Sequence, residues 1–232
     1  MNEKGYTNMP SWTKTVYKGG EGEITEKKSR FIATVHPVRS EEEALAFIEK
    51  MKKKYWDARH NCYAYILGEN QTCMRSSDDG EPQGTAGHPM LDVLTGEKLY
   101  DVAVVVTRYF GGVLLGTGGL VRAYSRAVQE GLKNSTLMEK KRGIPVTLET
   151  DYTGLGKLQY LTASRQIIVL DTLYEDCVKM KILLEPDRIA AFRGEVMDAT
   201  SGKAVWQEQE EIFYAKVDDR VLVGEDLHPE EH

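Results

Sequence analysis

Five glycines fall within nine residues of this chain, and they separate a buried strand from a helix. The β-branched apolar run at 102–106 is typical of a strand covered on both faces. From position 120 onward, apolar residues recur at spacings of three and four, which predicts an amphipathic helix. A connection this rich in glycine indicates a tight turn or a close approach by another group. The glycines are Gly111, Gly112, Gly116, Gly118 and Gly119.

The start of that helix is a candidate anion site. The first-turn amides of a helix carry positive potential, and a loop without side chains lets a phosphate or carboxylate reach them. Arg108 and Arg122 flank the loop and would supply the countercharge. The pattern lacks the lysine of a nucleotide-binding loop and the Gly-x-Gly-x-x-Gly register of dinucleotide folds. A simpler interpretation stays open, in which the glycines only make a tight connection and the arginines lie on a solvated face.

Composition indicates a globular protein. The chain has 232 residues, of which 41% are hydrophobic, and this allows one large domain or two small ones. No stretch reaches the roughly 20 apolar residues that a membrane span needs, and the first residues show no signal-like apolar region. We therefore expect a cytoplasmic protein with no membrane partner. Cys62, Cys73 and Cys177 form no Cys-x-x-Cys pair, which argues against a disulfide framework and a structural zinc site.

Charge is distributed unevenly along the chain. Residues 1–145 hold 21 basic and 18 acidic side chains, whereas residues 146–232 hold 9 basic and 18 acidic ones. The first part is therefore better suited to meet a polyanion than the second. The segment 140–145 combines charge, glycine and proline and marks the expected domain boundary. We predict domains at 1–140 and 145–218, followed by a flexible tail at 219–232.

Periodicity predicts an α+β chain. Ser40, with Glu43 three residues later, forms a capping box that begins an amphipathic helix after N-terminal strands. A polar loop at 76–89 and a short helical piece at 90–94 precede the buried strand. Beyond residue 145 the expected order is that of the ferredoxin-like βαββαβ unit, with two helices on one face of an antiparallel sheet. Its predicted elements are 146–151, 153–165, 167–174, 178–184, 187–200 and 204–214.

Several motifs in the first part resemble the signature of the IMPACT family, in its bacterial YigZ-like branch. The central motif runs from Arg108 through the glycine loop to Gly116, after the strand at 102–106. The other stretches that carry the resemblance are Ser29-Arg30-Phe31, Arg59-His60-Asn61-Cys62, Ser77-Asp78-Asp79-Gly80-Glu81-Pro82 and Gly84-Thr85-Ala86-Gly87.

The resemblance implies a ribosomal-protein-like α/β domain with a left-handed βαβ crossover, followed by a ferredoxin-like domain. It also implies a link to translation or RNA. Eukaryotic members of the family are linked to control of translation initiation, and they use an additional N-terminal domain for that task. The partner of that eukaryotic domain is therefore not carried over to this chain.

The leading hypothesis is a non-catalytic protein, without a cofactor, that binds RNA or the ribosome in regulation of translation. Arginines would contact phosphates, and Tyr63, Tyr109 or Phe110 would stack on unpaired bases. The candidate residues are Arg30, His60, Arg75, Arg108, Tyr109, Gly111, Gly112, Gly116, Gly118, Gly119 and Arg122.

Three alternatives stay open. A protein-binding adaptor, with a partner in the translation machinery, would agree with the acidic second part and the absence of a clear catalytic set. A phosphate- or nucleotide-binding enzyme would hold Mg²⁺ through carboxylates shared with a phosphate. Its candidate ligands are Asp78, Asp79 and Glu81. A zinc site, although its deaminase motif is missing, would draw on His60, Cys62, Cys73 and His88.

Overall fold

The computed structural model describes residues 12–68, 71–218 and 220–227, and the chain forms two compact units. Among the described residues, the first unit comprises those up to Lys140 together with 216–218, 220 and 225–227. The second unit comprises residues 141–215 and 221–224. The prediction of an α+β chain with two different parts is confirmed. None of the described helices has the length and apolar character needed to cross a membrane.

The first unit is built on a five-stranded sheet in the order β2-β3-β6-β4-β5. Because β3 and β4 each pair antiparallel with β6, they run in the same direction on either side of it. Helix α1 connects them, so β3-α1-β4 is a split βαβ unit. The left-handed sense of that crossover stays a prediction. The five strands of this sheet are β2 (Glu21–Glu26), β3 (Ser29–Pro37), β4 (His60–Leu67), β5 (Cys73–Ser77) and β6 (Val102–Tyr109). Strand β1 (Trp12–Lys18) precedes them and is not part of this sheet.

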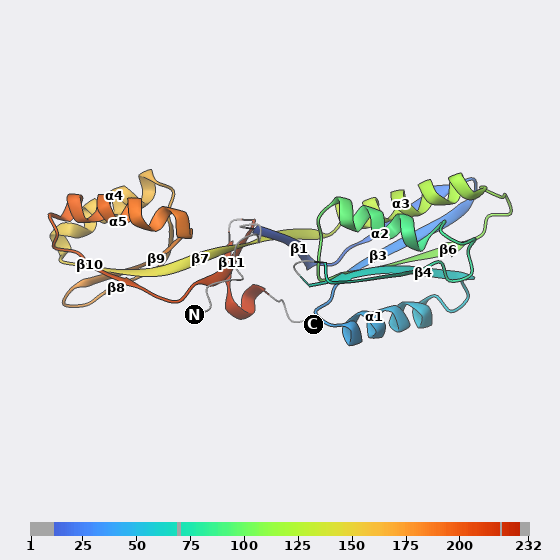
Figure 1. Cartoon of the computed structure of the whole chain (residues 1–232), viewed down its shortest axis with the longest axis horizontal. Helices are drawn as coiled ribbons and strands as arrows, with labels where there is room; N and C mark the ends of the chain where they lie inside the picture. The colour runs from blue at the N-terminus through green and yellow to red at the C-terminus, as the bar shows by residue number, and fades with distance from the viewer. Residues whose placement is uncertain (1–11, 69–70, 219, 228–232) are drawn as a thin grey trace, which may run out of the picture. The chain divides into compact units, whose positions relative to one another are not determined.

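Helices cover both faces of this sheet (Figure 1). Helix α1 (Glu41–Lys54) lies on one face, and α2 (Gly87–Gly96) and α3 (Thr117–Lys133) lie on the other. Strand β6 is buried on both sides, which explains its continuous apolar run. Its alternate residues Val104 and Val106 pack toward α2 and α3, whereas Ala103 and Val105 pack toward α1.

The predicted capping box begins α1. The Ser40 hydroxyl accepts a hydrogen bond from the Glu43 amide at 3.2 Å. The Glu43 carboxylate in turn accepts a hydrogen bond at 2.8 Å from the amide of Arg39, one residue before the cap. The first bond satisfies an amide that the first turn of a helix leaves without a partner, and the second ties the residue before the cap to that turn. The start of α1 therefore follows directly from the sequence.

The second unit has the predicted βαββαβ order, with α4 and α5 on one face of its sheet (Figure 1). Leu158 of α4 and Phe192 and Val196 of α5 are buried there against Leu148 and Ile182. The last predicted strand is broken into two shorter strands, of which β10 pairs with β7. The elements are β7 (Thr136–Thr150), α4 (Tyr152–Ser164), β8 (Ile168–Tyr174), β9 (Val178–Leu184), α5 (Ile189–Thr200), β10 (Val205–Glu208) and β11 (Ile212–Val217).

Three boundaries differ from those expected. The strand expected at 146–151 begins earlier, because β7 runs from Thr136 to Thr150, and the division between the units at Lys140 and Lys141 falls within this strand. The polar loop is shorter than expected, because β5 ends at Ser77 and α2 begins at Gly87. The expected tail includes strand β12 (Arg220–Val223) and a 3-10 turn (Gly224–Leu227) that ends in a buried leucine. Residues 219 and 228–232 of that tail lie outside the described residues.

Candidate functional site

The glycine loop is held against the turn between β2 and β3. Any Cβ at Gly111 would stand 2.0 Å from the carbonyl carbon of Lys28, so only glycine fits there. The Gly111 amide donates a hydrogen bond to the hydroxyl of Ser29 at 3.2 Å. Gly116 has a φ of +73°, in the left-handed region that favours glycine, and it precedes the first residue of α3. The loop therefore makes the tight strand-to-helix connection that the sequence indicates.

The start of α3 is exposed and carries no side-chain cap. Residues Gly116, Thr117 and Gly118 are solvent-exposed, and no side chain accepts from their amides. The guanidinium of Arg122 lies over this turn, 3.6 Å from where a Cβ of Gly118 would stand. Within the described part of the chain, no carboxylate forms an ion pair with Arg122. The first-turn amides and one guanidinium are thus both open to an anion.

Apolar side chains project from the loop beside this turn. Leu114 is 82% exposed, and Phe110 and Val113 are each exposed to nearly half of their surface. Soluble proteins seldom leave several such side chains uncovered in one short loop, and such patches mark interaction sites. An incoming partner would therefore meet both positive potential and apolar surface at this edge of the first unit.

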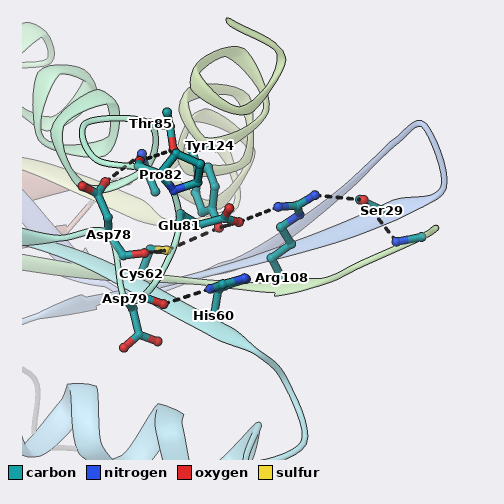
Figure 2. Close-up of polar contacts among 12 residues, drawn as sticks. Ser29, His60, Cys62, Asp78, Asp79, Glu81, Pro82, Thr85, Arg108 and Tyr124 are labelled. Carbon is teal, nitrogen blue, oxygen red and sulfur yellow. Dashed lines mark hydrogen bonds and ion pairs between the residues drawn. The ribbon is translucent and has the colours of Figure 1, made fainter. Parts of the chain in front are cut away.

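Arg108 is not a free phosphate ligand, and that expectation is wrong. Its side chain is 7% exposed and forms an ion pair with Glu81, whose side chain is 3% exposed, at an N–O distance of 2.6 Å (Figure 2). The hydroxyl of Tyr124 donates to the same carboxylate oxygen at 2.8 Å. A second nitrogen of Arg108 lies 3.4 Å from the Ser29 hydroxyl. The guanidinium is therefore buried inside the unit and not available to a phosphate. Through Glu81 it links β6 to α3 and to the loop after β5.

The expected magnesium ligands are also occupied. Asp78 accepts hydrogen bonds from the backbone amides of Gly84, Ala86 and Gly87 at 2.7–3.0 Å. Asp79 accepts from the backbone amide of Asn61 at 2.7 Å. Because Glu81 is paired with Arg108, the three carboxylates point to different partners, and the Mg²⁺ prediction is wrong for this arrangement. Among the described residues, no group of three potential ligands is placed to hold a metal ion.

Asp78 shapes the loop that carries the family motif. Partial burial raises the pKa of its carboxyl, but the hydrogen bonds from the amides of Gly84, Gly87 and Ala86 outweigh burial, so its pKa lies below the usual range. Ionised Asp78 therefore holds the loop between β5 and α2 in place, because it accepts hydrogen bonds from an amide in the loop and from amides at the start of α2.

The zinc ligands considered from the sequence are not assembled. Cys62 is buried, and its thiol donates to the carbonyl of Asp78 at 2.9 Å (Figure 2). Burial raises the pKa of this thiol well above its usual value, which disfavours the thiolate that binds metal. Cys73 pairs with Leu67 at the far end of β4, and His88 is exposed at the start of α2. The zinc prediction is therefore wrong for this set.

Strand alternation divides the remaining candidates between two faces of the sheet. His60 lies opposite Arg108, on the face covered by α2 and α3, and its Nδ1 is 2.9 Å from the carbonyl of Asp79. Arg30 lies opposite Tyr109 on the α1 face, and Arg75 lies opposite Tyr65 on that same face. A strand sends successive side chains to opposite sides, so the arginines cannot surround the glycine loop as a single ring.

The candidates on the α1 face already have partners. Arg30 forms an exposed ion pair with Glu23 at 2.8 Å. The hydroxyl of Tyr109 donates to Asp57 at 2.8 Å, and Arg75 donates to the carbonyl of Met74 at 3.1 Å. Of the arginines named from the sequence, Arg122 is the one that the structure brings to the exposed start of α3.

Sequence reasoning missed the part played by Tyr124. Its spacing along α3 identified it only as an apolar core position, yet its hydroxyl contacts both Glu81 and Cys62. Exposure of Leu114 was also missed, because an apolar residue in a loop gives no periodicity from which its direction can be read. A tyrosine in an otherwise aliphatic stripe is the signal that could have indicated a buried polar partner.

Comparison with known proteins places these motifs in two recognised domains. The sequence matches the Impact N-terminal domain over residues 27–132 and a domain of unknown function, DUF1949, over residues 148–203. A crystal structure described as that of a hypothetical protein is similar, with a TM-score of 0.55 and 32% identity, and the match covers 87% of this chain and 98% of that one. The protein thus joins an Impact N-terminal domain to a DUF1949 domain.

Two bacterial relatives are similar over most of their length. IMPACT family member YvyE of Bacillus subtilis is 43% identical over 202 residues, which cover 87% of this chain and 93% of the relative. IMPACT family member YigZ of Escherichia coli is 36% identical over 178 residues, which cover 76% of this chain and 87% of the relative. This chain belongs to the IMPACT family, as its sequence motifs indicate.

Proposed function

We propose that this protein binds RNA in the cytoplasm through the exposed start of α3, and that it acts on the ribosome in regulation of translation. The observation that carries the proposal is the open first turn, Gly116–Gly118, beside the guanidinium of Arg122. Amides at a helix start and an arginine are the groups that contact RNA phosphates. The resemblance to the IMPACT family supports the link to translation.

The side chains next to this turn suit a single-stranded segment. Phe110 is half exposed and stands at the end of β6, where its ring could stack on an unpaired base. Arg108 lies behind that ring, with its guanidinium carbon 5.6 Å from the ring centroid, and therefore supports the ring from the protein side. We expect preference for unpaired over duplex RNA, because a base must reach the ring.

The Arg122→Gln variant tests this role directly. We expect its affinity for a short single-stranded RNA to fall about fivefold to tenfold, and its salt dependence to lose about one unit of slope, as removal of one phosphate contact would give. Affinity is measured by fluorescence anisotropy at several salt concentrations. The matched control is Arg126→Gln, one turn further along α3, since Arg126 already faces Glu26 at 3.5 Å. Absence of RNA binding at low salt, or equal effects of the two variants, contradicts the proposal.

A protein-binding adaptor is the second candidate function, and the exposed apolar residues of the glycine loop favour it. Leu114 and Val113 give no contact specific to RNA. Ribosome binding that survives Arg122→Gln but is lost in Leu114→Ser would favour contact with a ribosomal protein. Loss in both variants would favour RNA with an apolar contact beside it.

A further inference from the structure

A cavity of about 530 Å³ opens in the first unit, away from the glycine loop. It lies where β3 ends, since its wall includes His36 and Pro37, which pair with Ala103 and Val102. The glycine loop follows the opposite end of β6. Arg30 and His36 are six positions apart on β3, a distance of roughly 20 Å along an extended strand. The cavity is therefore a separate place from the proposed RNA site.

The cavity floor is apolar and includes a flat ring. Val16, Val38, Met138 and Leu227 line it and are each almost completely buried. The ring of His36 stacks on that of Phe47, with centroids 4.7 Å apart and planes 16° apart. Both residues line the cavity, so a flat apolar group entering it would meet an aromatic surface.

The rim of the cavity carries charge on one stripe of α1. Glu43, Ala46, Phe47 and Lys50 line it at spacings of three and four, which places them on a single helix face. Arg39 precedes that helix and also lines the cavity. Arg39 and Lys50 are exposed, and neither side chain forms an ion pair with any carboxylate in the described part of the chain.

The carboxylates that line the cavity are held by backbone amides. Glu43 accepts from the amide of Arg39 at 2.8 Å, and Asp101 accepts from the amide of Gly68 at 2.8 Å. These bonds satisfy acceptor groups without using the two exposed cations. The lining carries three basic side chains, Arg39, Lys50 and Lys140, against the two carboxylates of Glu43 and Asp101. Its formal net charge is therefore positive, above an apolar, partly aromatic floor.

We propose that this cavity binds a small anion that carries a flat ring, of which a nucleoside monophosphate is the representative class. The ring would lie against the apolar floor beside His36, and the phosphate would contact Arg39 and Lys50. Cavities of about 300–1,000 Å³ hold such ligands, and the volume found here falls in that range. Both halves of the ligand are needed, because neither the floor nor the rim alone presents a complete site.

Isothermal titration of the full chain with adenosine monophosphate, adenosine and inorganic phosphate tests the proposal. We expect the monophosphate to bind at least about tenfold more tightly than either fragment. The double variant Arg39→Gln and Lys50→Gln should lose about tenfold or more in affinity for the monophosphate but little for adenosine. Ala46→Trp, a change at an exposed helix position, should fill the cavity and weaken both ligands.

Two results would overturn the inference. One is no heat of binding for the monophosphate up to about 5 mM, the range in which weak ligands are still detected. The other is binding that none of these variants changes, which would place the ligand elsewhere. The Arg126→Gln variant, whose residue lies in neither the cavity nor the proposed RNA site, serves as control and should bind the monophosphate as the wild type does. The two proposals are tested separately. A chain that binds the monophosphate but not RNA supports this inference alone, and a chain that binds RNA but not the monophosphate supports the proposed function alone.

Discussion

Replacement of Arg108 by methionine is expected to destabilise the first unit by about 3–5 kcal/mol, because it leaves the charge of Glu81 buried without its partner. The decrease in the free energy of unfolding should be several times larger than the decrease on removal of a surface ion pair, because Glu81 cannot be rehydrated unless the loop opens. The Tyr124 hydroxyl would remain as one hydrogen-bond donor to the carboxylate, which is too little to balance a full charge.

Urea denaturation followed by NMR signals of β6 measures this effect in the first unit separately from the second. The matched control is Arg30→Met, which removes an exposed ion pair with Glu23 and should cost under about 1 kcal/mol. The double variant Arg108→Met and Glu81→Leu should recover much of the lost stability, because it removes both charges. If Arg108→Met and Arg30→Met cost the same, the buried pair does not have the role assigned to it.

Replacement of Asp78 by alanine is expected to destabilise the first unit by about 2–4 kcal/mol, because three backbone amides lose a charged acceptor together. The effect should depend on pH. The pKa of Asp78 in the folded protein is below its usual value of about 3.9, so its stabilising contribution is complete above that value and is lost as pH falls through the folded pKa.

Urea denaturation of wild type and variant at neutral and strongly acidic pH checks both parts of this prediction. The difference in stability should shrink in acid, where the wild-type carboxyl is also protonated. Asp92→Ala, at an exposed position of α2, is the control and should cost little at either pH. A variant as stable as wild type at neutral pH would show that the loop does not depend on Asp78.

Local patterns predicted most of the secondary structure. The capping box at Ser40 marked the start of α1 because its two hydrogen bonds are made within one turn. Alternating and helical periodicity likewise predicted the order of the second unit. Its last strand was predicted as continuous, whereas the chain breaks between β10 and β11, which depends on pairing with β7 rather than on local sequence.

The candidate site was harder to predict, because side-chain direction decides it. Arg108 shares its face of β6 with Val104 and Val106, both of which pack in the core, and this alternation could have indicated that it points inward. Its partner Glu81 is 27 residues away in sequence, so no local pattern links the two. Arg122 was predicted correctly to lie on an outer face of α3, since helical spacing separates it from the apolar stripe.

The most direct measurement is an NMR titration of the full chain with a short single-stranded RNA, following the backbone amides of Thr117, Gly118 and Gly119. These amides form the open first turn of α3, and an RNA phosphate seated there must shift them. We predict that they show the largest shifts in the chain, and that Arg122→Gln reduces those shifts at the same RNA concentration. Shifts confined to other parts of the chain, with these three amides unchanged at saturation, would contradict the account.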